Sequence, residues 1–188
     1  MRTTRAAPRT PRPGATLLAA GRAGRRGRRG PTVAAVVLGT LLAPATLRAQ
    51  DSFHWRGELG PGQVLEVKGV NGAIRAEPAE GREVEVTATK RAGRSDPDEV
   101  RVEVVRHAEG ITICALYATG GRGSVCAPGG GGRTNVRNND VQVDFTVKAP
   151  TGVRFIGRTV NGSLSALRLE GDVELYTVNG GIELRRTL

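Results

Sequence analysis

The side chains with the clearest chemistry in this 188-residue sequence are two cysteines, Cys114 and Cys126. A metal site would need further ligands at suitable spacing, and the sequence holds only two histidines, His54 and His107. Paired cysteines in an exported protein are more often joined than free, and closing this loop of about 13 residues contributes roughly 3 kcal/mol in the chain-entropy model. The sequence therefore favours a disulfide over buried free thiols, and both over a metal site.

Three further groups contain residue types that occur in catalytic or cofactor sites. Neither His54 nor His107 lies beside a recognisable nucleophile, so both are expected to be structural. Residues 120–124 are rich in glycine but lack the Lys-Ser or Lys-Thr ending and the helix of a phosphate loop. Residues 96–99 hold three carboxylates without the oxygen spacing or turn glycine of a calcium loop. We therefore expect a protein without enzymatic activity, cofactor or bound metal.

The net charge of +10 is concentrated at the amino terminus. Residues 1–49 carry ten arginines and no acidic residue, so residues 50–188 hold 18 basic and 18 acidic residues and have no net charge. A neutral body has no long-range field to steer a polyanion. We therefore expect no nucleic-acid partner.

The basic segment has the organisation of a secretory signal peptide. Four arginines within residues 25–29 precede an apolar stretch over residues 33–45, and Ala49 supplies a small residue for cleavage. The apolar stretch is shorter than the roughly 20 residues that span a bilayer. We predict a signal peptide over residues 1–49, with an uncleaved amino-terminal anchor as the alternative. After cleavage no membrane span is expected, and the body lies in the periplasm, in the outer envelope or outside the cell.

Residues 50–188 are expected to form a single all-β domain. Apolar and polar residues alternate over residues 82–90, 100–104 and 141–147, which is the period of half-buried strands. Clusters of glycine and proline separate these runs. The segment 127–139 includes four consecutive glycines and is predicted to lack defined structure.

An internal repeat is the most specific feature of the sequence. Residues 159–166 align with residues 177–184 at an offset of 18, and residues 70–76 form a looser earlier copy. One interpretation is a hairpin meander with Asn-Gly turns, whose residues tolerate positive φ. The other, which the fixed register of the apolar residues favours, is a β-solenoid-like stack of short strands preceded by a partly antiparallel β region. Its corner residues are Asn71, Gly72, Asn161, Gly162, Asn179 and Gly180, and stacking would place Asn161 above Asn179 in a side-chain ladder.

These motifs resemble the bacterial putative-adhesin β-strand-repeat family, also described as toastrack-like. The resemblance rests on KGVNGAIRA, RTVNGSLSAL, YTVNGGIEL, the GDVEL between the last two, the opening FHWRGELGPGQVLEVKGVNG, and ITICALY followed by VCAPG. It covers residues 52–188. Similar sequences often carry a cysteine pair where this chain has Cys114 and Cys126. The family has no established catalytic residues, so none is carried over.

The resemblance implies an exported, non-catalytic domain that presents a surface at the cell envelope for adhesion or assembly. The alternative is a regulatory or sensory module in envelope stress that docks onto a membrane partner. An envelope protein or a surface polymer is the expected partner. The family usually continues through more repeats, so either the reading frame is truncated at Leu188 or a partner covers the last repeat. Self-association through that open end would also cover it.

Overall fold

The computed structural model describes residues 52–118 and 123–186, and the predicted signal peptide over residues 1–49 lies outside the described residues. The described part contains no α-helix and one 3-10 helix, η1 (Pro97–Glu99). It contains eleven strands: β1 (Ser52–Glu58), β2 (Val64–Lys68), β3 (Ile74–Pro78), β4 (Glu83–Arg91), β5 (Val100–His107), β6 (Gly110–Tyr117), β7 (Gln142–Ala149), β8 (Arg154–Arg158), β9 (Leu164–Leu167), β10 (Val173–Tyr176) and β11 (Ile182–Arg185). The all-β prediction is confirmed. Among these residues no helix has the length and apolarity to cross a membrane.

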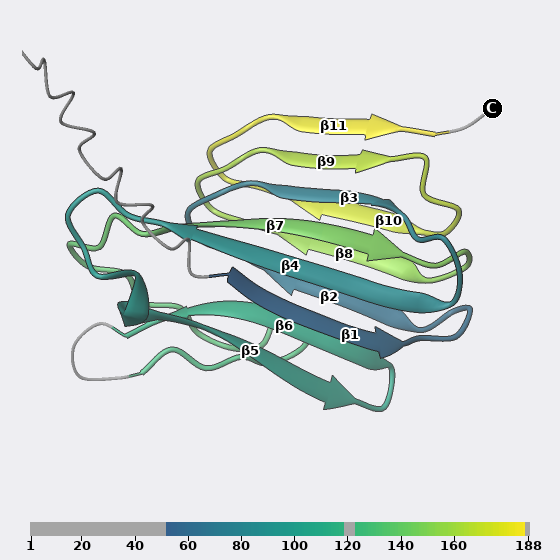
Figure 1. Ribbon diagram of the computed structural model, residues 1–188, viewed down its shortest axis with the longest axis horizontal. Coiled ribbons are helices and arrows are strands. Elements are labelled where there is room, and N and C mark those ends of the chain that lie inside the picture. The colour runs from purple at the N-terminus through teal and green to yellow at the C-terminus, as the bar shows by residue number, and fades with distance from the viewer. Residues whose placement is uncertain (1–51, 119–122, 187–188) are drawn as a thin grey trace, which may run out of the picture. The chain divides into compact units, whose positions relative to one another are not determined.

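The strands form two mixed sheets that pack face to face (Figure 1). The six-stranded sheet has the order β1-β4-β7-β3-β9-β11, and the five-stranded sheet has the order β10-β8-β2-β6-β5. Each sheet contains both parallel and antiparallel pairs. Alternate side chains of the strands meet between the sheets, which explains the period of two in the sequence.

Three strand pairs repeat the same path through both sheets, and we call each pair a coil. In the coils β2–β3, β8–β9 and β10–β11, the first strand lies in the five-stranded sheet and the second in the six-stranded sheet. Successive coils pair in parallel and in register. Ile182 pairs with Leu164 and Leu184 pairs with Ala166, as the 18-residue offset predicts.

The strands of the antiparallel region lie at the predicted residues, but their place relative to the stack differs from the prediction. The region does not precede all the repeats, because β4 to β7 are inserted between the first coil and the second. The insertion is possible because β2 and β3 each have two neighbours. β6 and β7 flank the first coil on one side, and β8 and β9 flank it on the other. The coil that comes first in the sequence is therefore internal to both sheets.

The core between the sheets is built from the predicted alternating positions. Val84, Val86 and Ala88 of β4 are fully buried, and so are Phe145 of β7 and Phe155 of β8. Each large apolar side chain contributes about 1.5–3 kcal/mol when it is fully buried. The core therefore holds both sheets together and fixes the positions of the corners that connect them.

Candidate functional site

The Asn-Gly corners of the three coils lie directly above one another. Asn71, Asn161 and Asn179 form parallel bridges between the segments that connect the two strands of each coil. The side-chain amide of Asn161 donates to Asn71 Oδ1 at 2.9 Å, and that of Asn179 donates to Asn161 Oδ1 at 2.9 Å. The side chains thus form a continuous, solvent-exposed amide ladder across the coils, with every amide donating in the same direction.

The glycines of these corners are required mainly because backbones approach closely. A Cβ on Gly162 would lie 1.9 Å from the carbonyl oxygen of Gly72, and one on Gly180 would lie 2.0 Å from that of Gly162. Only Gly72 has a positive φ, of 121°. At Gly162 and Gly180 it is the stacking of the coils that excludes a side chain.

A shallow groove runs beside the amide ladder and has a volume of about 460 Å³. Asp144 forms part of its wall, accepting a hydrogen bond from the Ala73 amide at 2.8 Å and pairing with Arg91. The groove lies where the corners of the first two coils meet β7 and the segment before it, and its lining is polar: Asn71, Gly72, Ala73, Asp140, Gln142, Asp144, Asn161, Gly162 and Ser163. The groove therefore offers amide, hydroxyl and carboxylate groups to a ligand, and its acidic groups are already partnered.

The coil β10–β11 is exposed along its outer side, where the ladder ends. β10 and β11 are edge strands of their sheets (Figure 1). Two side chains whose counterparts in the second coil are buried are open to solvent here: Ile182 is 52% exposed and Leu184 47%, whereas Leu164 is 1% and Ala166 0% exposed. Val178 is 74% exposed, against 38% for Val160. An edge with unpaired backbone groups and exposed apolar side chains is a template for pairing with another chain. We call the outer side of β10–β11 the open edge.

A buried ionic cluster lies on the other face of the five-stranded sheet, and sequence reasoning missed it. Glu66 is 1% exposed. Its carboxylate accepts hydrogen bonds from Arg158 Nε at 2.9 Å, from Thr112 Oγ1 at 3.1 Å and from the Gly129 amide at 2.9 Å. Lys68 Nζ lies 3.7 Å from the same carboxylate, and burial lowers the pKa of this lysine. No local signal in the sequence identifies the loop that covers Glu66.

That covering loop contains the run of four glycines. The prediction that it lacks defined structure is wrong, because Lys68 Nζ donates to the carbonyls of Ala127 at 2.6 Å and Gly131 at 3.1 Å. Cys114 and Cys126 form a disulfide with a Cα–Cα distance of 5.7 Å. The disulfide ties the start of the loop to β6. Hydrogen bonds from Lys68 and to Glu66, together with the disulfide, thus hold the loop against the five-stranded sheet.

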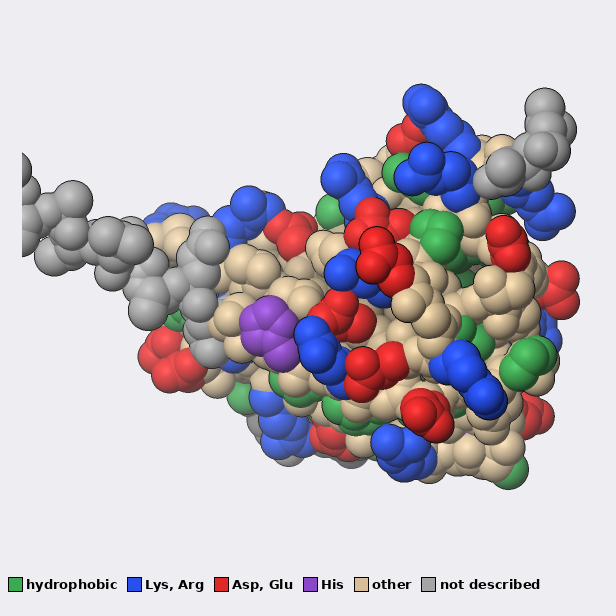
Figure 2. All heavy atoms as spheres, turned by 45° about the vertical axis from the view of Figure 1, so that its right-hand side comes forward, with side chains coloured by type: hydrophobic (Ala, Val, Ile, Leu, Met, Phe, Trp, Pro, Cys, Tyr) green, Lys and Arg blue, Asp and Glu red, His purple; other side chains and the backbone are tan. Residues whose placement is uncertain are grey.

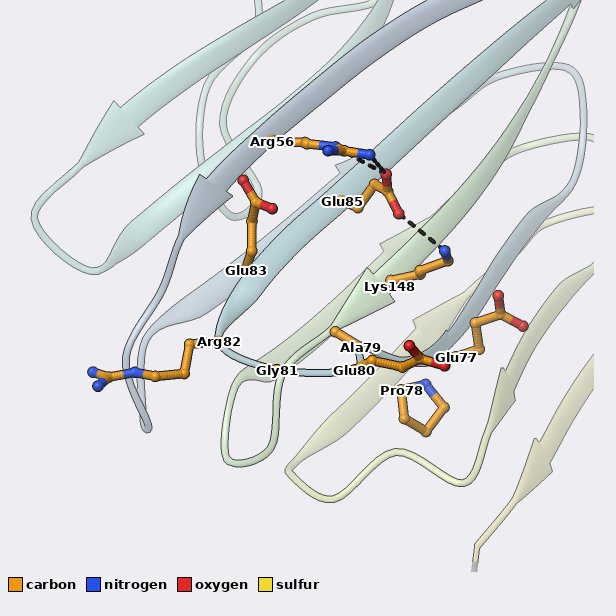
Figure 3. A pocket seen from close by; sticks show the side chains of 10 residues that line it. All are labelled: Arg56, Glu77, Pro78, Ala79, Glu80, Gly81, Arg82, Glu83, Glu85 and Lys148. Atoms are coloured by element: carbon orange, nitrogen blue, oxygen red, sulfur yellow. Dashed lines mark hydrogen bonds and ion pairs between the residues drawn. The ribbon is translucent and has the colours of Figure 1, made fainter.

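A second hollow, of about 460 Å³, lies at one end of the six-stranded sheet (Figure 3). Glu85 lies between Lys148 and Arg56, with 3.0 Å to Lys148 Nζ and 2.9 Å to Arg56 Nε. Hydrogen bonds from Lys148 and Arg56 lower the pKa of Glu85, and those to Glu85 raise the pKa of both cations. A carboxylate held in this way stays ionised and is a poor general acid. The other lining residues are Glu77, Pro78, Ala79, Glu80, Gly81, Arg82 and Glu83.

The two histidines lie in different sheets, and His107 is linked through Thr112 to the Glu66 cluster. His54 of β1 contacts the hydroxyls of Thr87 and Ser52, and His107 contacts the hydroxyl of Thr112. Asp96 caps the 3-10 helix by accepting from the Asp98 amide at 3.0 Å. Within residues 52–118 and 123–186, no three His, Cys, Asp or Glu side chains are arranged to hold a metal ion.

Charged side chains of both signs are interspersed on the face shown in Figure 2. Ion pairs also connect neighbouring strands of the described chain, such as the pair of Arg154 with Glu174. Ion pairs of exposed side chains contribute little to stability, but they leave no extended patch of one sign on this face.

Comparisons with known proteins give the following findings. No family model matches the chain, and no curated protein matches it. It is similar to the crystal structure of a putative cell adhesion protein from Clostridium sporogenes ATCC 15579, with 10% identity, a TM-score of 0.38, and coverage of 72% of this chain and 59% of that one. It is also similar to a putative adhesin from Bacteroides fragilis NCTC 9343, with 12% identity, a TM-score of 0.34, and coverage of 72% and 54%. The chain thus spans less than two thirds of the length of either protein.

Proposed function

We propose that this chain is an exported, non-enzymatic β-repeat domain that presents a surface at the cell envelope for adhesion or assembly. The observation that carries the proposal is the open edge, where Ile182 and Leu184 are exposed although Leu164 and Ala166, their counterparts in register, are buried in the stack. Exposed apolar side chains beside unpaired strand edges are typical of surfaces that bind another protein.

In this proposal the coils β2–β3, β8–β9 and β10–β11 form a short β-solenoid. Their parallel registers and the amide ladder support this interpretation. Each coil of a solenoid pairs in parallel with its neighbour, so the outer side of β10–β11 offers the same kind of pairing surface to a further coil.

The disulfide supports export. Disulfides persist in the periplasm and outside the cell, whereas the cytosol keeps most thiols reduced. The Cys114–Cys126 bridge fastens the loop over the Glu66 cluster. A stable product in the cytosol would have to keep this loop in place without the bridge.

The test has two measurements on the full chain. First, the protein is recovered from cytoplasmic, envelope and medium fractions, and its intact mass is measured with and without reductant. We expect an exported, oxidised species. Second, the purified protein is incubated with intact cells and with the isolated envelope of the organism that encodes it, and we expect saturable association.

Two variants locate the binding surface. Ile182→Asp places a charge on the open edge, and Thr146→Asp places one on the exposed face of β7 as the matched control. We expect Ile182→Asp to lose association, Thr146→Asp to keep it, and both to keep the β-sheet circular dichroism of the unaltered chain. A reduced cytoplasmic protein without association would contradict the proposal, and capture of one membrane protein alone would favour the envelope-stress alternative.

A further inference from the structure

The contact between neighbouring coils is made by a fixed set of corner hydrogen bonds. Between the first and second coils, Asn161 donates from its side chain to Asn71 Oδ1 and from its backbone to the Val70 carbonyl at 2.7 Å. The Gly72 amide donates to the Asn161 carbonyl at 3.0 Å, and Thr159 Oγ1 donates to the Gly72 carbonyl at 3.3 Å.

The same four bonds recur between the second and third coils. Asn179 donates from its side chain to Asn161 Oδ1 and from its backbone to the Val160 carbonyl at 2.7 Å. The Gly162 amide donates to the Asn179 carbonyl at 3.0 Å, and Thr177 Oγ1 donates to the Gly162 carbonyl at 3.0 Å. The hydrogen bonds between neighbouring coils therefore repeat by translation. In each interface a Thr, an Asn and a Gly make the contacts.

The third corner, at the open edge, carries the same acceptor and donor groups that the first and second corners use in these four hydrogen bonds. Among the described residues, Asn179 Oδ1, the Val178 carbonyl and the Gly180 amide and carbonyl have no neighbouring coil to pair with. An occupant that fits must supply an Asn side-chain amide, an Asn backbone amide, an Asn carbonyl and a Thr hydroxyl. Ile182 and Leu184 would then gain apolar partners in register.

Steric fit adds a further requirement. Each added corner places its glycine against the carbonyl oxygen of the glycine below, at a distance that would bring a Cβ within 2.0 Å. The next corner must therefore also have glycine after asparagine. Gly181 differs, because a Cβ there would meet nothing within 4 Å.

We infer that the open edge binds, by parallel strand addition on both sheets, a polypeptide coil with a Thr-x-Asn-Gly corner followed by alternating apolar residues. The inference rests on the proposed function and names the chemistry of its assembly partner. Continuity of the interface favours this occupant over a second copy of the chain. A two-fold axis would set β11 antiparallel to its mate and bring equivalent groups together, leaving the Gly180 amide without an Asn carbonyl.

The test uses the full chain, isotopically labelled for NMR, and synthetic peptides with the sequence of residues 169–186. Ordering a free peptide is costly, so the affinity is expected to be low and NMR titration is the suitable readout. We expect saturable shifts confined to β10, β11 and their corner, with slower hydrogen exchange of the Gly180 amide.

Three altered peptides define specificity without altering the protein. Gly180→Ala in the peptide should abolish binding, and the matched Gly181→Ala should leave it unchanged. Asn179→Asp in the peptide removes the amide that donates to Asn179 Oδ1 of the protein, and should weaken binding about tenfold, as expected for one lost hydrogen bond.

The outcomes separate this inference from the proposed function. Absence of peptide binding, equal binding of the two alanine peptides, or a dimer of the chain that excludes the peptide would each overturn the inference. Envelope association without peptide binding would leave the proposed function intact. Peptide binding without envelope association would overturn the proposed function and leave the inference about the corner intact.

Discussion

The stack of three coils has one side flanked by β6 and β7, which we call the covered side, and one open side, the open edge of β10–β11. The two sides differ although the coils follow the same sequence pattern. Ile74, Leu164 and Ile182 occupy equivalent positions in successive coils and pair in register. Ile74 and Leu164 are each 1% exposed, whereas Ile182 is 52% exposed. The presence of a neighbouring coil, and not the residue type, therefore decides how much each apolar side chain contributes to stability.

The two sides also differ in how polar groups are held. On the covered side, Glu66 is buried among cations and beneath a loop tied by the disulfide. On the open side, Glu174 pairs with Arg154 and Glu183 pairs with Arg185, all at partly exposed positions. Exposed ion pairs contribute little to stability, so the open coil depends almost entirely on its contact with the second coil.

The largest expected difference in the free energy of unfolding comes from truncating one buried apolar side chain of the stack and one apolar side chain at the open edge. Leu164→Ala should lower the free energy of unfolding by about 2–5 kcal/mol, because it leaves a cavity between two coils. Ile182→Ala, at the paired position, should cost under about 1 kcal/mol, because its side chain is already half in water. Urea unfolding followed by circular dichroism measures both. Equal losses would show that the open edge is covered in solution.

Loss of the disulfide should have the next largest effect. Replacing Cys114 and Cys126 together by alanine should lower the free energy of unfolding by about 3 kcal/mol, because the unfolded chain gains freedom. Thermal unfolding of the variant and of the unaltered chain, each with and without reductant, measures this effect. Reductant should destabilise only the unaltered chain, and a variant as stable as the oxidised protein would contradict the expectation.

Two glutamates at neighbouring register positions of the five-stranded sheet test whether a buried and an exposed carboxylate differ in their contribution to stability. Glu66 and Glu174 both pair across strands with Ile156. Glu66→Gln should cost about 2–3 kcal/mol, because buried hydrogen bonds to charged groups are lost. Glu174→Gln should change stability little, since its partner Arg154 remains solvated. Chemical unfolding of the two variants under identical conditions distinguishes them, and similar losses would mean that Glu66 is hydrated in solution.

Sequence reasoning was most successful where local pattern and repeat length decide the structure. The alternation around Val84 and Phe145 identified buried strand faces, because a period of two leaves one face inward. The 18-residue offset fixed which residues stack, because an in-register repeat permits only one pairing.

It was least successful where segments far apart in the chain meet. Glu66 is covered by a loop more than 60 residues away, and alternation along β2 contains no information about that loop. The pairing of β6 and β7 with the first coil was not predicted for the same reason, since strand pairing is a long-range property. The reason for glycine at Gly162 and Gly180 also depends on the preceding coil and not on the turn itself.

The smallest expected effect is a pH dependence from Asp140, in the segment that leads into β7 on the covered side. Its carboxylate accepts hydrogen bonds from the Ser95 amide at 2.9 Å and the Arg94 amide at 2.9 Å, and the bond from Ser95 is the main cause that lowers its pKa from 3.8 to about 2. A depressed pKa means that the folded state favours the charged form, so the stabilisation is fully present above pH 3.8 and is lost as the pH falls through about 2. Carboxyl NMR should therefore give a midpoint near 2. The stability advantage of the unaltered chain over Asp140→Asn should shrink across the same interval. A midpoint at the ordinary value would show that the loop carrying Arg94 and Ser95 does not hold Asp140 in solution, and would weaken the contrast between the two sides of the stack.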